Sequence, residues 1–232
     1  LTAHESMKLV VSERLQPTQP PTETKKVNLS LLDTTTANFG PATSVWAYRN
    51  LNGRLTFDSL TASLKETLNS FPQWCGHLKW ADETKNHFAL TYGTSDDPGI
   101  GFTCYTCTLS LEDVYPSIDT MKEKRYWKNE GEFDPSIELA FSAGVSLAAP
   151  HNESADGLPV ILIQLTQFSC GGMAVMVRMA HVLADATSLT LFVEHWSLLH
   201  RGLSPKHYPI FDPVALDRHA TAMNEQSLER VK

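Results

Sequence analysis

Cysteine is scarce in this sequence of 232 residues, with only Cys75, Cys104, Cys107 and Cys170 present. So few cysteines exclude a small disulfide-rich scaffold and favour a reducing compartment, so we expect a cytoplasmic protein. Cys104 and Cys107 have the CxxC spacing of zinc and redox sites, but they fall in an apolar, Thr-rich stretch that predicts a strand. Residues three apart point to opposite faces of a strand. We therefore expect no metal site there.

Long hydrophobic runs and clusters of positive charge are also lacking. No apolar run approaches the ~20 residues of a membrane helix, and the N-terminus shows no secretory signal pattern. The formal net charge is −7 with no basic stripe to offset it, so we expect neither a membrane nor a nucleic-acid partner. With 42% hydrophobic residues, the chain can still bury a large core of one domain or one and a half.

The hydrophobic pattern indicates an α/β chain. Leucines at 60, 64 and 68 recur every fourth position and predict a helix over residues 58–69. A second helix is expected to begin near Ser188, whose hydroxyl can cap it, and to end at Gly202. Residues 113–138 are charged and irregular, and residues 203–232 resemble a linker. The strands that we expect are 8–14, 43–48, 71–80, 87–92, 100–111, 159–168 and 173–180.

The most informative segment surrounds His181. Two predicted strands joined by the turn 169–172 form a hairpin that runs into His181, and a helix follows soon after. Backbone on both sides would aim the imidazole at a fixed point, where it can accept a proton near neutral pH. Asp185 could hydrogen-bond the imidazole directly, or pair with an arginine and so fix the loop.

Other candidate residues have simpler interpretations. His195 and His200 are five positions apart on the predicted helix and do not share a face, which argues against a metal site. We expect Trp196 to be a core residue. Ser30 and Asp33 are interpreted as packing and turn residues. The Gly171-Gly172 pair serves a turn and lacks the pattern of a phosphate loop.

Several ordered motifs together resemble the BAHD family of plant and fungal acyl-CoA-dependent acyltransferases. The matching segments are Asn28-Leu-Ser-Leu-Leu-Asp33, Phe71-Pro-Gln-Trp-Cys-Gly-His-Leu78, Gln164-Leu-Thr-Gln-Phe-Ser-Cys-Gly-Gly172, His181-x-x-x-Asp185 and Leu216-Asp-Arg218. Each is weak alone, but their order and spacing are specific. The sequence departs from the family at Cys75 and His77, where the motif has alanine and arginine, and at Ala186, where glycine is usual.

The resemblance implies a domain like that of chloramphenicol acetyltransferase, with a mixed β-sheet flanked by helices, as one half of a two-domain enzyme. It further implies acyl-CoA as a co-substrate with no permanently bound cofactor, and His181 as the general base that deprotonates a hydroxyl or amine. Asp185 in the family is structural and points away from the channel. Ala186 would be strained if that position required a positive φ.

The family's Asp-Phe-Gly-Trp-Gly element and second half have no counterpart in the sequence. We therefore expect residues 1–200 to form the N-terminal acyltransferase domain and residues 201–232 to begin an interdomain linker. The C-terminal half would be a partner, either as a separate chain or as a missing part. The expected reaction is acyl transfer, with acetyl favoured, to a specialised metabolite. Two alternatives are a homotrimeric acetyltransferase like chloramphenicol acetyltransferase and a non-catalytic binding domain of the same fold.

Overall fold

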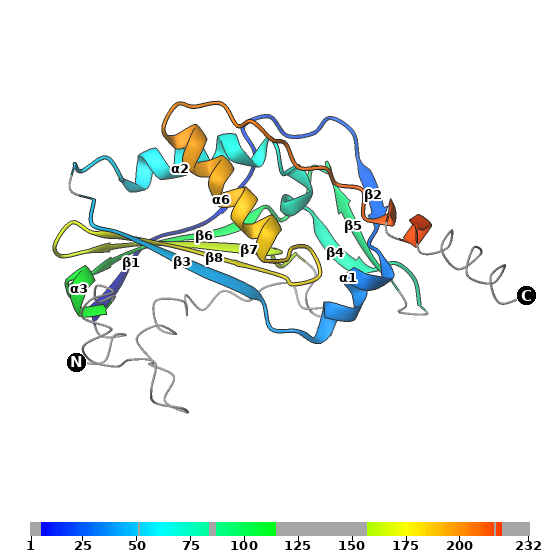
Figure 1. Cartoon of the computed structure of the whole chain (residues 1–232), viewed down its shortest axis with the longest axis horizontal. Coiled ribbons are helices and arrows are strands. Elements are labelled where there is room, and N and C mark those ends of the chain that lie inside the picture. The colour runs from blue at the N-terminus through cyan, green and yellow to red at the C-terminus, as the bar shows by residue number, and fades with distance from the viewer. Residues whose placement is uncertain (1–5, 51, 84–86, 115–156, 216, 220–232) are drawn as a thin grey trace, which may run out of the picture.

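A computed structural model describes residues 6–50, 52–83, 87–114, 157–215 and 217–219 of the chain. Two β-sheets and two long helices make up most of this part (Figure 1). The fold is α/β, with the mixed sheet flanked by helices that the family resemblance implies. The predicted irregular segment 113–138 lies almost entirely outside the described residues.

The larger sheet has five strands in the order β1-β6-β7-β8-β3. All neighbouring pairs are antiparallel except β6 and β7, which run parallel. The strands are β1 (Met7–Leu15), β3 (Ala42–Tyr48), β6 (Ile100–Cys107), β7 (Ile161–Phe168) and β8 (Met173–Met179). These bounds agree with the predicted strands to within a few residues. The expectation that Cys104 and Cys107 point to opposite faces of a strand is also confirmed, because Cys104 belongs to the main core and Cys107 to a separate small cluster.

The smaller sheet has three antiparallel strands in the order β2-β5-β4. They are β2 (Lys25–Asn28), β4 (His77–Trp80) and β5 (Phe88–Tyr92). The sequence prediction of one strand over residues 71–80 is wrong in its first half, because Pro72–Cys75 forms the 3₁₀ helix η3. Proline at the first helical position suits a helix start, since its missing N–H has no intrahelical acceptor to lose.

Helices α2 (Phe57–Leu68) and α6 (Ala186–His200) lie together on one face of the larger sheet (Figure 1). A capping box starts α2, in which Thr56 and Ser59 satisfy each other's backbone N–H groups. Trp196 is 3% exposed and donates its indole N–H to the carbonyl oxygen of Leu60 at 3.1 Å. The prediction of Trp196 as a core residue is therefore confirmed.

The remaining helices are short. They are α1 (Leu31–Thr35), the 3₁₀ helix η2 (Thr36–Asn38) and α3 (Leu111–Val114). The Ser30 side chain caps α1, and the Asp33 carboxylate accepts a hydrogen bond from the Ser30 N–H at 3.0 Å. Both residues thus have the structural role predicted for them. The hairpin turn between β7 and β8 contains Gly171 at a φ of 81°, a left-handed conformation that glycine adopts without strain.

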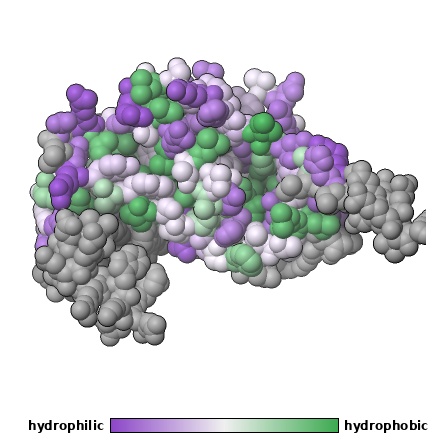
Figure 2. Space-filling model, in the orientation of Figure 1, coloured by the Kyte–Doolittle hydropathy of each residue, from purple (hydrophilic) through white to green (hydrophobic). Residues whose placement is uncertain are grey.

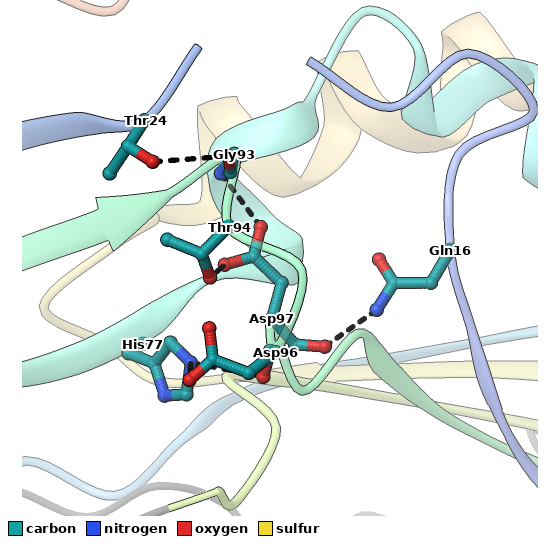
Figure 3. A network of polar contacts seen from close by, with 7 residues as sticks. All are labelled: Gln16, Thr24, His77, Gly93, Thr94, Asp96 and Asp97. Atoms are coloured by element: carbon teal, nitrogen blue, oxygen red, sulfur yellow. Dashed lines mark hydrogen bonds and ion pairs between the residues drawn. The ribbon is translucent and has the colours of Figure 1, made fainter. Parts of the chain in front are cut away.

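A network of hydrogen bonds fixes the loop between β5 and β6 (Figure 3). The Asp97 carboxylate accepts from the Gly93 N–H at 2.7 Å and from the Thr94 hydroxyl at 2.5 Å. The Asp97 carbonyl oxygen accepts from Gln16 Nε2 at 2.7 Å. The loop is thereby joined to the segment that follows β1.

His77, the position where the family motif has arginine, takes part in the same region (Figure 3). Its Nε2 lies 3.2 Å from the carbonyl oxygen of Asp96. A carbonyl oxygen can only accept, so this bond requires the ring proton on Nε2. His77 therefore ties β4 to the loop and serves the fold.

Apolar side chains reach the surface in separate places among hydrophilic ones (Figure 2). The large exposed apolar residues are Leu9, Val10, Leu31, Leu32, Phe39, Tyr48, Leu203, Tyr208 and Ile210. Within the described ranges, no helix combines the length and the hydropathy that a bilayer crossing requires.

Candidate active site

His181 lies in the turn that connects β8 to α6. In the antiparallel pair of β8 and β3, Met179 is opposite Ala42, so the turn leaves the sheet beside the segment that enters β3. The N–H of Leu183 donates to the carbonyl oxygen of Ala180 at 3.0 Å and closes the turn around His181. Buried residues on either side, Ala180 and Val182, anchor the backbone, while the His181 side chain itself is half-buried.

The two ring nitrogens of His181 have different surroundings. Nδ1 is buried and has no hydrogen-bond partner among the described residues, whereas Nε2 is not among the enclosed atoms. The ring of Phe39 stands nearly perpendicular to the imidazole, with 5.4 Å between centroids and 78° between planes. The imidazole is thus held from one side and open at Nε2, which suits a group that exchanges protons with a small molecule.

Asp185 is the N-cap of α6. Its carboxylate accepts a hydrogen bond from the Ser188 N–H at 2.8 Å. That bond lowers the pKa of Asp185, against a smaller opposing effect of burial. In the part of the chain that the structure describes, the carboxylate bonds neither the imidazole nor an arginine. The helix therefore begins at Ala186, and the expectation that Ser188 caps it is wrong, because Asp185 is the side chain that reaches the free N–H groups.

Removing this cap should cost stability in a pH-dependent way. We expect Asp185→Ala to lower the free energy of unfolding by about 1 kcal/mol at neutral pH, and Asp185→Asn to keep most of it, because asparagine also caps. A carboxyl whose pKa is lowered in the fold stabilises above its unfolded value of about 3.9 and loses that contribution as pH falls through the folded value. The difference between wild type and Asp185→Ala in urea titrations should therefore shrink below about pH 4. A difference that is constant with pH would contradict the capping role.

Ala186 raises no backbone strain. Among the described residues other than glycine, only Asn50 has a positive φ, and Ala186 is the first residue of α6. The departure from glycine at this position is therefore compatible with the local fold, because alanine is a good helix former.

The other two histidines of α6 contact side chains of neighbouring elements. His195 is 1% exposed and packs between the rings of Phe71 and Tyr208, each with 5.3 Å between centroids. Burial lowers the pKa of His195. His200 Nδ1 lies 3.2 Å from the Ser63 hydroxyl and links α6 to α2. No group of three metal-ligating side chains occurs in the described ranges.

A sequence model described as the Transferase family matches residues 6–227. The chain belongs to the BAHD acyltransferase family. This BAHD chain is 27% identical over 234 residues to acyltransferase AFT15-1 of Alternaria alternata, covering 93% of the chain and 44% of that protein. It is 30% identical over 204 residues to epi-neemfruitin B synthase L1AT of Melia azedarach, covering 85% of the chain and 40% of that protein.

Solved structures share the fold of the BAHD chain. Vinorine synthase aligns with a TM-score of 0.62 at 21% identity, covering 89% of this chain and 45% of that one. TRI101 of F. graminearum, solved with ethyl coenzyme A, aligns with a TM-score of 0.51 at 16% identity, covering 80% and 41%. The chain thus spans less than half the length of the relatives that it matches.

Of the site residues predicted from sequence, the structure places His181 and Asp185 on the same turn but does not join their side chains. Phe39, which contacts the His181 ring, is not among the residues predicted from sequence. A correct prediction that β3 pairs with β8 would have indicated this contact. That register brings the residues just before Ala42 beside those just after Met179. The BAHD chain therefore builds one side of the site from two distant segments.

Proposed function

We propose that the complete protein transfers an acyl group from acyl-CoA to a hydroxyl or amine of a small molecule, with His181 as the general base. The observation that carries this proposal is the half-buried imidazole on the β8–α6 turn, with Nδ1 enclosed and Nε2 open. Nε2 accepts the proton of the acceptor as its oxygen or nitrogen attacks the thioester carbonyl. The tetrahedral intermediate then collapses and releases CoA as the thiolate.

Coenzyme A as the carrier of the acyl group is supported by family membership and by the names of relatives. One relative, 25% identical over 214 residues, is the acetyl-CoA-benzylalcohol acetyltransferase of Clarkia breweri, and it favours acetyl as the group transferred. We propose a specialised metabolite as the acceptor and no permanently bound cofactor. Four free cysteines fit a reducing compartment, so we place the protein in the cytoplasm.

A second, C-terminal half completes the site in this proposal, with residues 1–200 as the N-terminal domain and residues 201–232 leading toward it. The chain covers 44% of AFT15-1, which leaves room for such a half. Within the described part of the chain, His181 Nδ1 also lacks the hydrogen-bond partner that normally fixes the tautomer of a catalytic histidine. In this scheme Asp185 supports the turn by capping α6 rather than by touching substrate.

The test is acyl transfer by the complete protein, followed through the CoA thiol released from acetyl-CoA and through the mass of the acylated product. Alcohols and amines of increasing size serve as acceptors. Release of CoA that depends on both substrates supports the proposal. Native mass spectrometry separates the alternatives, because a homotrimer of this chain alone favours the enzyme like chloramphenicol acetyltransferase. Binding of CoA without turnover favours the non-catalytic domain.

A further inference from the structure

Phe39 is an aromatic side chain that remains 62% exposed while its ring touches the His181 imidazole. Burial therefore does not explain its position, since most of its apolar surface stays in solvent. The near-perpendicular arrangement at 5.4 Å is a favourable geometry for two aromatic rings. The contact restricts the rotamers open to the imidazole, because the Phe39 ring occupies one side of it.

The backbone holds Phe39 at this place. Phe39 has extended dihedrals (φ −79°, ψ 149°), and its N–H donates to the carbonyl oxygen of Thr36 at 2.9 Å. Ala42 pairs with Met179, and continuing that register brings the approach to β3 alongside the turn that carries His181. A Cβ added to the neighbouring Gly40 would meet no atom within 4 Å beyond its two chain neighbours, so open space adjoins the backbone at Gly40.

The helix α1, which precedes Phe39, is held in turn by the tail of the chain, residues 203–215 and 217–219. α1 continues through η2 directly to Phe39. Besides the Ser30 cap, the Asp217 carboxylate accepts a hydrogen bond from the Leu31 N–H, with oxygens at 3.2 and 3.4 Å. A negative charge at the start of a helix is favourable, because the N-terminal N–H groups point toward it. Asp217 thus joins the tail to the segment that ends in Phe39.

We propose that Phe39 is a positioning residue that orients the His181 imidazole, and that Asp217 sets the position of Phe39 through α1. The proposal rests on the function proposed above and adds to it a physical connection between the tail and the base. Small misplacements of a catalytic group are costly, because proton transfer requires a near-attack geometry. In this proposal the tail determines the orientation of the His181 imidazole, in addition to connecting parts of the chain.

Steady-state kinetics of variants in the complete protein test the proposal. Phe39→Ala should lower kcat about tenfold with little change in KM for acetyl-CoA, because it disturbs the orientation of the His181 imidazole and leaves acetyl-CoA binding intact. Phe39→Tyr keeps the ring and should retain most of the activity. Asp217→Asn should lower kcat about threefold by weakening the bond to Leu31. Asp212→Asn is the matched control, since Asp212 is a tail carboxylate that bonds Arg218 at 2.6 Å instead.

The imidazole signals of His181, assigned by comparison with His181→Ala in NMR spectra of labelled histidine, give a readout that needs no turnover. These signals should shift in Phe39→Ala and Asp217→Asn but not in Asp212→Asn. Unchanged kcat and signals in Phe39→Ala overturn the positioning role. A response to Phe39→Ala without one to Asp217→Asn overturns the link to the tail. If the wild type transfers no acyl group, the proposed function fails by itself, and the signals still decide whether tail and imidazole are connected.

Discussion

Replacing His181 by alanine should lower acyl transfer by about two to four orders of magnitude, the range that general-base catalysis contributes. The variant keeps Asp185 and the cap of α6, and the half-buried side chain that it loses makes no hydrogen bond to the described residues. We therefore expect the urea unfolding midpoint to stay close to that of the wild type. The measurement is kcat/KM from CoA release, compared between the variant and the wild type under identical conditions.

His207→Ala is the matched control for this experiment. His207 is an exposed histidine in the tail for which the structure gives no contact with His181. Its removal changes histidine content without touching the proposed site, so turnover should be unchanged. If His181→Ala kept the turnover of the wild type with its fold intact, the assignment of the base would be wrong, and the fold would have to serve catalysis through another group or serve binding alone.

Replacing Gly76 by alanine should destabilise the fold by on the order of 3 kcal/mol, the cost of forcing extra volume into a packed interior. Gly76 lies between η3 and β4, and an added Cβ would come within 2.3 Å of the Thr91 carbonyl oxygen and 2.7 Å of Tyr92 Cβ. Its φ of −88° is accessible to any residue, so the expected cost comes from the clash with β5 and not from backbone strain. Chemical denaturation monitored by tryptophan fluorescence measures it, since Trp74 and Trp80 are nearby in the sequence.

Gly40→Ala provides the comparison, because a Cβ at Gly40 would meet no atom within 4 Å. We expect its free energy of unfolding to stay within about 0.5 kcal/mol of the wild type. Equal destabilisation by the two substitutions would show that the contact between Gly76 and β5 is not what matters. A larger effect at Gly76 would indicate that the Phe71–Leu78 motif requires glycine because β4 and β5 approach each other closely at this position.

Much of this architecture was predictable because its signals are local. The leucines at 60, 64 and 68 follow one helical face, and all three are buried in α2. The alternation along β8 is also reflected in the structure, since Val175 and Val177 belong to the main core and Ala174 to the opposite cluster. The position of His181 at the end of this strand follows from the same pattern.

The features that sequence did not reveal depend on contacts between distant segments or on competition between neighbours. Phe39 meets His181 because of the β3–β8 register, and Asp217 meets Leu31 across most of the chain. At the start of α6, Asp185 and Ser188 are both capable caps, and only geometry decides between them. The tail likewise resembles a linker in composition, but Tyr208 packs on His195 and Phe211 lies against Tyr92.

The pairing of the larger sheet has a consequence for how the chain folds during synthesis. β1 pairs with β6 and β3 pairs with β8, so the partner of each of these N-terminal strands is synthesised much later. Contacts between residues far apart in sequence slow folding, because the intervening loop must close before they form. At about 5 to 20 residues per second on the ribosome, β3 would remain without its partner strand β8 for several seconds after it emerges. We expect ribosome-bound chains that stop before β8 to be recognised by chaperones, and chains that extend past α6 to become protease-resistant.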